Sequence, residues 1–417
     1  MTMLPQPDLA ARNRRYHALD ALRAGAMLLG VVLHAAVAYL DRPMAGLVWA
    51  VDDASAGPWL DAVFWWIHAF RIPLFFVMAG FFSAMVVRSR GVSGFVMLRL
   101  RRVAVPLLVA AAVVLPVVYV IWSWGWVRAG RATWREVRHL EFRDPHIQQN
   151  FLGPAHLWFL EYLLIYCLIY AVLAWWRGAE RAGEGEAGSP PRGRCSCPWL
   201  TSWYSPLVVA LPTAAVLLAE PGVFVRFRNP ILPDAWELVY HGWAFACGVW
   251  LWGQREGLAR LGRTGPWHLA LGVAAFAGWA WLTRGGGGGE HEPSVATRGG
   301  LTMLIALTCW GTAYGFTGLA MRWLDTDRPA VRFLSDSAYW IYLTHLPLVG
   351  LGQVLLMPSG LHPAGKFALT TAAAFALTLL TYRGVVRYTI VGRCLNGPRT
   401  RPEPSGPTGL TPHTLKP

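Results

Sequence analysis

The sequence has few charged residues for its length, and acidic residues are the rarer kind. Of its 417 residues, 14% are charged, with 23 Asp and Glu against 37 Lys and Arg. Soluble globular domains contain about 25% charged residues. Hydrophobic residues make up 55%, and apolar runs of about 17 residues or more recur along nearly the whole chain. This composition excludes an ordinary soluble domain and predicts a polytopic membrane protein.

Cysteine is also scarce, and its spacing does not form a metal-binding motif. The six cysteines include no CxxC pair accompanied by a histidine cluster, so we expect no metal site. The formal net charge is +14, which alone would suit a nucleic-acid-binding protein. The arginines stand next to the apolar runs, however, so we expect the lipid bilayer as their partner and no nucleic acid.

Membrane-spanning helices account for most of the chain. The sequence predicts an all-α, polytopic bundle of about ten transmembrane helices, at residues 18–40, 58–87, 103–126, 154–176, 204–219, 235–253, 266–283, 299–321, 333–354 and 365–386. Pro73 in the second span predicts a kink or a break. We expect one transmembrane domain over 18–390, between a cytoplasmic N-terminal tail (1–17) and a cytoplasmic, disordered C-terminal tail (391–417).

The distribution of basic residues predicts the orientation of these spans. With the N-terminus inside, the cytoplasmic segments carry about twice as many Lys and Arg as the outer loops. The outer loop 127–153 is unusually basic for its position. The bias nevertheless favours a topology with both termini in the cytoplasm.

The first span carries two costly polar residues, Arg23 and His34. Eleven residues of helix rise by about 16 Å and turn by about 20° beyond three full turns, so both side chains share one face. Asp20, three residues before Arg23, is placed to pair with it. Taken singly, Arg23 could reach phosphate groups at the interface and His34 could bond to a neighbouring helix. Together on one face they favour a polar channel entered from the cytoplasm.

Further ionisable residues stand inside the expected spans. His68 and Arg71 belong to the second span, and His345 lies in "YWIYLTHLP". His156 opens "HLWFLEYLL", with Glu161 about one turn later. Ionisable side chains within a membrane are energetically costly and commonly mark functional sites. A single membrane histidine is often structural, but four of them with a buried arginine favour a functional site.

The stretch "FVMLRLRRVAVP" places Arg99, Arg101 and Arg102 just before the third span, on the expected cytoplasmic side. Such a cluster is by default an anchor that orients the span. Arginine also pairs phosphate groups through two parallel hydrogen bonds. The cluster is therefore either an anchor or a phosphate-binding site.

Four stretches together resemble the acyltransferase-3 family of integral membrane acyltransferases. Arg23 and His34 match the Arg-x10-His pattern of its first span. "FFVMAGFF" is similar to its FFVLSGF stretch, "FVMLRLRRVAVP" to its F-x3-R-x2-R-x3-P pattern, and "YWIYLTHLP" to its late SYxIYLxHxP pattern. Within the family, "LDALR", "HLWFLEYLL" and "TYRGVVRYTIVGRCLNG" most resemble the members that succinylate periplasmic glucans.

The resemblance implies a multi-pass O-acyltransferase of the inner (plasma) membrane. It implies transfer of an acetyl or succinyl group from cytoplasmic acyl-CoA to a hydroxyl group of an extracytoplasmic carbohydrate. Acyl-CoA is then a donor substrate, and no permanently bound cofactor is expected. The oligomeric state stays open.

The resemblance also suggests roles for the candidate residues. His34 is the expected base that takes a proton from the attacking hydroxyl group, or a carrier of the acyl group, with His345 as the alternative. Arg71 or Arg23 would stabilise a developing oxyanion or position the donor. The remaining candidates are phosphate-binding Arg99, Arg101 and Arg102, and substrate-binding His68, His156 and Glu161.

A secondary transporter or flippase is the alternative hypothesis. Buried histidine and arginine also serve proton relays and anion pathways. The sequence shows no inverted repeat and no pair of broken helices, which such transporters commonly have. A purely structural or sensory membrane protein would not explain the order of the four motifs.

Overall fold

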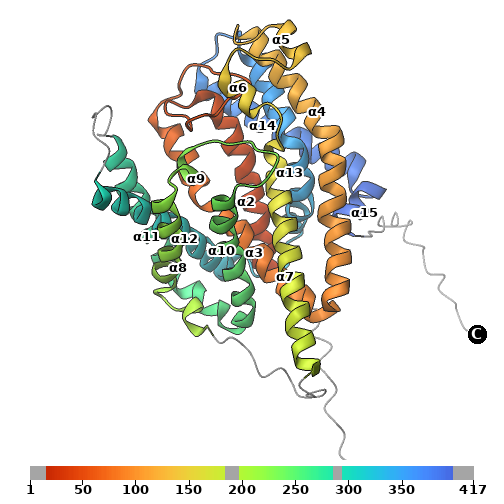
Figure 1. Cartoon of the computed structure of the whole chain (residues 1–417), viewed down its shortest axis with the longest axis vertical. Coiled ribbons are helices and arrows are strands. Elements are labelled where there is room, and N and C mark those ends of the chain that lie inside the picture. The colour runs from red at the N-terminus through yellow and green to blue at the C-terminus, as the bar shows by residue number, and fades with distance from the viewer. Residues whose placement is uncertain (1–15, 184–196, 285–293, 398–417) are drawn as a thin grey trace, which may run out of the picture.

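The computed structural model describes residues 16–183, 197–284 and 294–397, and this part of the chain is helical throughout (Figure 1). The described residues contain no β-strand, only an isolated bridge between Ala45 and Arg226. The all-α class predicted from the apolar runs is therefore confirmed.

Each predicted span coincides with one of ten long helices in the described ranges. These are α2 (His17–Ala36), α3 (Pro58–Arg99), α4 (Val105–Arg128), α7 (Trp158–Gly183), α8 (Ser205–Ala219), α10 (Ala235–Gly253), α11 (Leu258–Arg284), α12 (Val295–Trp323), α13 (Pro329–Leu356) and α14 (Pro363–Thr381). The short elements are η1 (Val37–Tyr39), η2 (Leu100–Ala104), α5 (Trp134–His139), α6 (Pro145–Asn150), η3 (Ala155–Leu157), η4 (Pro198–Thr201), α9 (Gly222–Val225), η5 (Arg255–Gly257), η6 (Tyr382–Val386) and α15 (Ile390–Asn396).

Six helical stretches of the described chain are long and apolar enough to cross a membrane. They are His17–Tyr39, Pro58–Arg128, Ala155–Gly178, Val295–Trp323, Pro329–Leu356 and Pro363–Val386. The second stretch has 71 residues and contains both α3 and α4. At about 1.5 Å per residue it is several times longer than a hydrocarbon core of about 30 Å. Helices α8, α10 and α11 cover the other predicted spans; α8 is apolar but has only 15 residues, and α10 and α11 are not among the stretches of sufficient length and apolarity. The chain is therefore a multi-pass membrane protein.

Helix α3 continues through Pro73, so the break expected there is not found. Its backbone leaves helical geometry at Gly91, with φ 72° and ψ 176°. A positive φ is readily adopted only by glycine, which has no Cβ to clash with the backbone. The chain turns after this point through η2, a π-helical segment that joins α3 to α4.

The expected C-terminal tail begins with an ordered helix rather than with disorder. Helix α15 contacts η2 and α13, and Leu395 is buried in the main core. An apolar side chain supplied by the tail extends the packed domain to this helix. The rest of the expected tail, from residue 398, lies outside the described residues.

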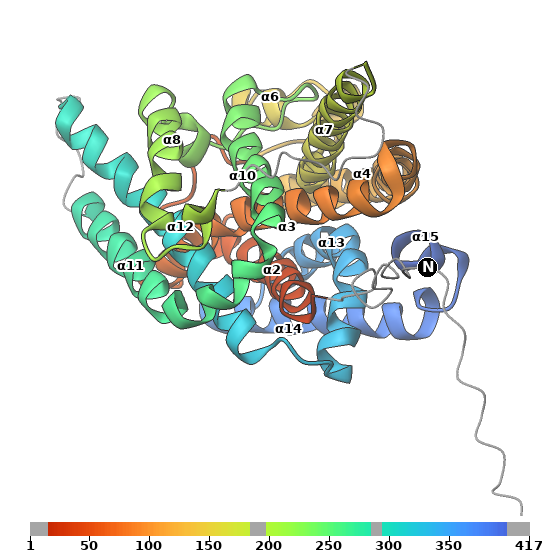
Figure 2. The same ribbon diagram turned by 90° about the horizontal axis from the view of Figure 1, so that it is seen from below.

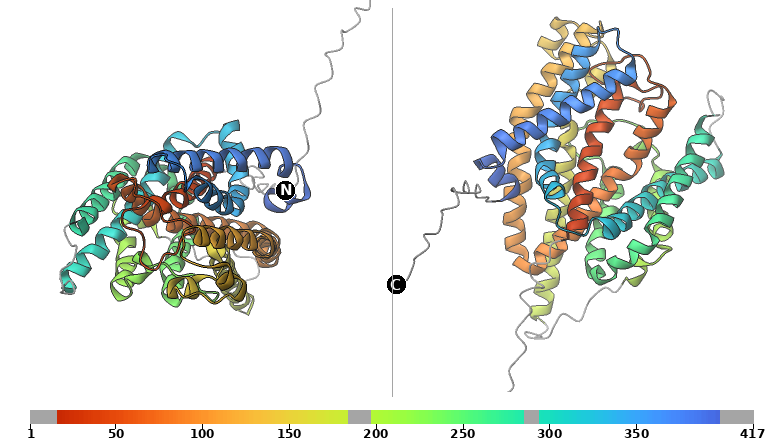
Figure 3. Two further views of the ribbon diagram at one scale, coloured as in Figure 1. Left: turned by 90° about the horizontal axis from the view of Figure 1, so that it is seen from above. Right: turned by 180° about the vertical axis from the view of Figure 1, so that it is seen from behind.

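Helix α2 lies inside the bundle and contacts α3, α12, α13 and α14. Seen from below, α13 and α14 lie beside it (Figure 2). Helix α7 lies on the near face in Figure 1, whereas α14 lies on the far face, which Figure 3 shows from behind. Most positions of α2 are therefore buried or half-buried, whereas the Arg23 side chain is 41% exposed.

Two loops cover the end of the bundle that carries α5 and α6, which we call the upper end, as in Figure 1. The loops 41–57 and 220–234 are joined where Phe227 N–H donates to the Ala45 carbonyl at 2.8 Å. The buried Lys366 ammonium of α14 donates to the Asp53 carboxylate at 2.7 Å. These contacts fix the loops above α2. The opposite end, which holds η2 and η6, is the lower end.

Candidate active site

Two histidines from distant parts of the chain meet inside the bundle. His34, near the end of α2, lies 2.8 Å from His345 of α13, measured between His34 Nδ1 and His345 Nε2. Their ring planes differ by 7°, with centroids 5.0 Å apart. Such nearly coplanar rings suit a hydrogen bond directed from one ring nitrogen to the other.

The surroundings of His345 decide which nitrogen carries each proton. Its Nδ1 lies 3.0 Å from the Ile341 carbonyl and 2.8 Å from the Tyr342 carbonyl. Carbonyl oxygens only accept, so His345 Nδ1 is the donor and Nε2 of the neutral ring is an acceptor. His34 Nδ1 then donates to His345, and His34 Nε2 keeps a free lone pair. This tautomer makes His34 Nε2 a base.

Gln353 and Trp49 hold the segment around His34. The Gln353 side chain is fully buried and donates to the Ala35 carbonyl at 3.0 Å. The Trp49 indole donates to Gln353 Oε1 at 2.7 Å, and its ring centroid lies 5.8 Å from that of His34. Neither residue was identified from the sequence, because a lone glutamine or tryptophan in a span has no distinctive pattern.

A third histidine, His156 of η3, packs against the His345 ring of this pair. Its Nε2 donates to the Leu343 carbonyl at 3.2 Å, while its own carbonyl accepts from the Tyr342 hydroxyl at 2.6 Å. Its ring stands edge-on to His345, with centroids 5.4 Å apart. His156 Nδ1 is buried without a hydrogen-bond partner in the described chain. The third histidine therefore offers a second free acceptor at the same centre.

Arg71 of α3 brings a positive charge to the histidines. A Cβ added at Gly30 would collide with the Arg71 guanidinium, which therefore lies against α2. Gly30 is four residues before His34, so both positions face the same way one turn apart. Arg71 also lines a small cavity together with all three histidines, His34, His156 and His345.

Two cavities open from His34 towards the upper-end loops. The aromatic cavity, of about 100 Å³, is lined by His34 and His156 and by the rings of Trp49, Tyr119, Trp122 and Trp126. The basic cavity, of about 150 Å³, is lined by residues that include His34, His68, Arg71, Arg226, Arg228 and Glu237. His68 donates from Nε2 to the Phe224 carbonyl at 3.0 Å, so it fixes the loop that forms the cavity wall.

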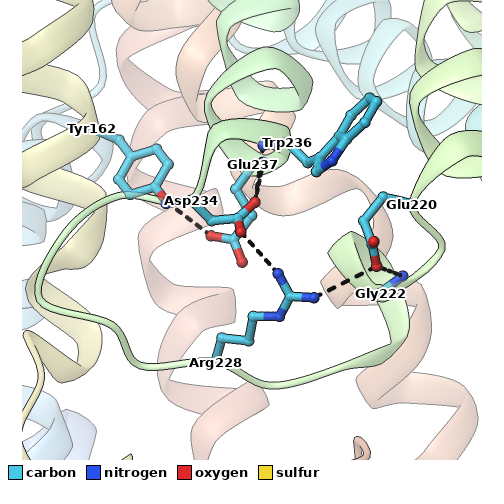
Figure 4. A network of polar contacts seen from close by, with 7 residues as sticks. All are labelled: Tyr162, Glu220, Gly222, Arg228, Asp234, Trp236 and Glu237. Atoms are coloured by element: carbon cyan, nitrogen blue, oxygen red, sulfur yellow. Dashed lines mark hydrogen bonds and ion pairs between the residues drawn. The ribbon is translucent and has the colours of Figure 1, made fainter.

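A polar network at the rim of the basic cavity was not predicted from the sequence (Figure 4). Arg228 pairs with Asp234 at 2.8 Å and with Glu220 at 3.6 Å. The Tyr162 hydroxyl donates to the Glu237 carboxylate at 3.0 Å. Asp234 and Glu237 open α10, so an N-cap signal was present in the sequence, but their partners are too distant in the chain to be found from it.

The lower end of the bundle gathers a second group, the arginine cluster of Arg23, Arg90, Arg99 and Arg102. Arg23, Arg90 and Arg99 lie close enough to Arg102 to act on its charge. Arg99 donates to the Ser83 hydroxyl at 3.1 Å. The pairing expected for Arg23 is confirmed, since it lies 3.2 Å from Asp20.

The sequence-predicted residues thus divide between the two ends of α2. His34, Arg71, His156 and His345 meet in one centre, and His68 lines the adjoining cavity. Arg23 shares a helix face with His34 but belongs to the arginine cluster. Arg99 and Arg102 belong to that cluster as well. The last two candidates lie outside both groups, since Arg101 is exposed and Glu161 is absent from the residues that line the cavities at His34.

Comparison with known proteins identifies a family and several relatives. A family model described as an acyltransferase domain matches residues 16–383. Proteins named glucans biosynthesis protein C, from Salmonella paratyphi A and Salmonella agona, are 24% identical to this chain over 354 residues, which is 84% of this chain and 84% of each relative. The protein of the same name from Salmonella schwarzengrund is 23% identical over the same length. No solved structure matches the chain.

Proposed function

The chain belongs to this acyltransferase family, and from that premise we propose that it transfers an acetyl or succinyl group from cytoplasmic acyl-CoA to a hydroxyl group of an extracytoplasmic carbohydrate. The name shared by the relatives refers to glucans, which supports a glucose-based acceptor. The proposal concerns the donor and the acceptor, since family membership already makes the chain a membrane acyltransferase.

We further propose that the protein crosses the inner (plasma) membrane ten times, with both termini in the cytoplasm. The arginine bias of the sequence supports this orientation. The lower end then faces the cytoplasm and the upper end faces outwards. Helices α8, α10 and α11 would cross together with the six longer stretches because they pack along them, α8 and α11 on α12 and α10 on α3.

The arginine cluster is our proposed site for the phosphate groups of acyl-CoA. Its guanidinium groups lie close to one another. Among the described residues, Asp20 is the one carboxylate that forms an ion pair with the cluster. Crowded cations repel one another, and a diphosphate would relieve that repulsion. Arg23 and His34 are separated by about 16 Å along α2, which matches the reach of an extended pantetheine arm from phosphate to thioester.

The observation that carries the catalytic proposal is the relay of hydrogen bonds through His345 to His34. It leaves His34 Nε2 as the free basic nitrogen, as a general base requires. When His34 takes a proton, His345 Nε2 still accepts from its Nδ1. The protonated ring is therefore stabilised without a carboxylate.

The proposed reaction needs no covalent enzyme intermediate. His34 Nε2 takes the proton of the acceptor hydroxyl, and the hydroxyl oxygen forms a bond to the thioester carbon. The carbon–sulfur bond then breaks, and the leaving thiolate takes the proton from His34 Nε2. The products are an ester on the carbohydrate and free CoA, and His34 returns to its starting state.

The aromatic cavity is our proposed entrance for the carbohydrate. Trp49 and Trp126 donate their indole N–H groups to Gln353 and to the Trp49 carbonyl, respectively. Indoles held in this way offer ring faces and edges rather than N–H groups to a ligand. Sugar rings present apolar C–H faces that pack on such aromatic surfaces.

Acyl transfer by purified protein tests the proposal. With acetyl-CoA or succinyl-CoA and a glucose oligosaccharide, we expect release of the CoA thiol and a gain of one acyl mass on the sugar. His34→Gln should lower kcat by about 10²–10⁴-fold, the usual contribution of a general base. His139→Gln, at an exposed position on α5, is the matched control and should keep full activity.

Two results would contradict the proposal. Near-normal turnover by His34→Gln would show that this imidazole is not the base. Movement of an anionic or glycan-linked substrate across the membrane, without release of CoA from any donor, would favour a transporter.

A further inference from the structure

Arg71 is a cation inside the bundle that has no anionic partner in the described chain. No carboxylate oxygen of the described residues lies within 4.0 Å of its guanidinium, and its Nε is buried without a hydrogen-bond partner. The polar groups around it are those of His34, His156, His345 and Tyr342, none of which is a carboxylate. An unpaired cation within a membrane protein is costly, so a partner from outside the chain is expected.

Glu237 does not meet this need, although it lines the same basic cavity. Its carboxylate accepts from the Tyr162 hydroxyl at 3.0 Å and forms no ion pair with Arg71 at 4.0 Å or less. It belongs to the network that holds the start of α10 to α7. The charge of Arg71 is therefore left for a ligand.

The mouth of the basic cavity carries a second uncompensated cation. Arg226 is exposed on the loop 220–234 and forms no ion pair with a described residue. Its neighbour Arg228 is already paired with Asp234 and Glu220. The cavity thus has one free cation at its entrance and one beside the base. A passage with positive charge at both ends attracts anions and excludes cations.

We propose that the basic cavity receives an anionic group of a substrate, a carboxylate or a phosphate, which pairs with Arg71 beside His34. The pairing fixes the substrate relative to the base and selects substrates that bring such a group. This inference rests on the proposed acyl transfer. The anion can be carried by the acyl group, as in a succinyl chain, or by the acceptor carbohydrate, and the experiment separates these two sources.

The test compares Arg71→Gln with the parent protein on four substrate pairs. Acetyl-CoA and succinyl-CoA are each combined with a neutral glucose oligosaccharide and with the same oligosaccharide bearing one phosphate. For the pairs that carry the recognised anion, kcat/KM should fall by about 10- to 100-fold, the loss of one charge-assisted contact. For acetyl-CoA with the neutral acceptor the fall in kcat/KM should be at least tenfold smaller than for the pairs that carry the recognised anion. If kcat/KM falls for succinyl-CoA with either acceptor, the recognised anion belongs to the acyl group. If it falls for the phosphorylated oligosaccharide with either donor, the anion belongs to the carbohydrate.

Other outcomes overturn the inference. An equal loss on all four pairs would mean that Arg71 acts only on the charge that develops in the reaction. An unchanged kcat/KM on all four pairs would leave Arg71 without a role in substrate binding. Absence of transfer by the parent protein with every pair would instead refute the proposed function itself.

Two further variants keep the test decisive. If Arg71→Gln does not accumulate, Arg71→Lys keeps the charge but loses the paired N–H groups, and its kcat/KM should fall only for substrates with the recognised anion. Unchanged selectivity in that variant would count against the inference. Arg128→Gln, an exposed arginine of α4 stacked only on Trp124, is the matched control and should keep the selectivity of the parent.

Discussion

At the scale of single residues, the site depends on an asymmetry between two histidines. The His345 ring binds two backbone carbonyls of its own helix, whereas the His34 ring forms a hydrogen bond only to His345 among the described residues. One ring is therefore anchored and the other is poised to exchange a proton. We therefore propose that His345 is a positioning residue, which would act on the substrate through His34.

Substitution of His345 tests that division of roles. His345→Gln keeps a group that can accept from His34 Nδ1, whereas His345→Phe fills the same space without an acceptor. We expect kcat to fall by about tenfold or less in the first variant and by about 100-fold or more in the second, within the usual range for acid–base catalysis. The pH at which kcat reaches half of its maximum should also be lower in the phenylalanine variant, since protonated His34 loses the acceptor for its Nδ1 proton. Equal activity and the same pH profile in both variants would mean that His345 only fills space.

The residue types of this centre could be predicted from the sequence, but their contacts could not. A membrane-buried histidine is costly enough to be noticed wherever it stands, so His34, His156 and His345 were all identified. Their pairing joins positions 311 residues apart, and no local pattern specifies such a distance. Gln353 was not identified from the sequence, since an uncharged side chain within a span costs less free energy than an ionisable one and so attracts less attention.

At the scale of elements, two backbone irregularities shape the lower end. The glycine at position 91 and the π-helical η2 turn the chain between α3 and α4, where Arg101 is exposed and Arg102 is half-buried. Single-turn π-segments often accompany functional sites, because they re-aim side chains without ending the helix. Periodicity predicted both long helices here, and Pro73 predicted a kink or a break, of which the break is not found. A proline within a long helix removes one hydrogen bond, which packing against neighbouring helices offsets in this case.

The arginines on this turn yield a prediction about donor binding. The double substitution Arg99→Ala with Arg102→Ala should weaken acyl-CoA binding by about 1.5–3 kcal/mol for each lost phosphate contact. Isothermal titration with the acyl-CoA donor measures the change in Kd. Arg101→Ala is the matched variant, because Arg101 is exposed on the same turn, and it should have a smaller effect. An unchanged Kd in the double variant would favour the alternative interpretation, in which these arginines only anchor the protein in the membrane.

The contact between α11 and α12 yields a second prediction at this scale. A Cβ added at Gly272, Gly311 or Gly318 would meet backbone atoms of the opposite helix, so the two helices pack through glycine. Close approach through small residues is a common way for helices to associate in membranes. Gly318→Val should therefore cost about 1–3 kcal/mol by overpacking. Thermal unfolding in detergent should show a lower midpoint than for Gly299→Val, where the same helix has open space. Equal midpoints would contradict this account of the interface.

At the scale of the whole molecule, α2 connects two groups with different chemistry. The arginine cluster stands at the lower end, the histidine centre lies further along the same helix, and both cavities open from it towards the upper-end loops. A face shared by Arg23 and His34 could be predicted from helical geometry alone. The cavities could not, because they are formed by loops 41–57 and 220–234, which come together through a bridge between residues far apart in the sequence.

This division predicts that the two substrates are used from opposite sides of the membrane. Acyl-CoA is too polar to cross a bilayer, so in sealed inside-out vesicles donor added outside reaches the arginine cluster, whereas in right-side-out vesicles it does not. With a glucose oligosaccharide trapped in the lumen, we expect acylated sugar only in the inside-out vesicles, and all of it in the lumen. Permeabilising both preparations with detergent should abolish the difference, which controls for the amount of active enzyme. In a second experiment, acceptor is added together with the donor to the outside of inside-out vesicles. Acylated sugar formed outside the vesicles would mean that both substrates enter from the same side. In that event the proposed orientation of α2 between a donor end and an acceptor end would be wrong, even if His34 were still the base.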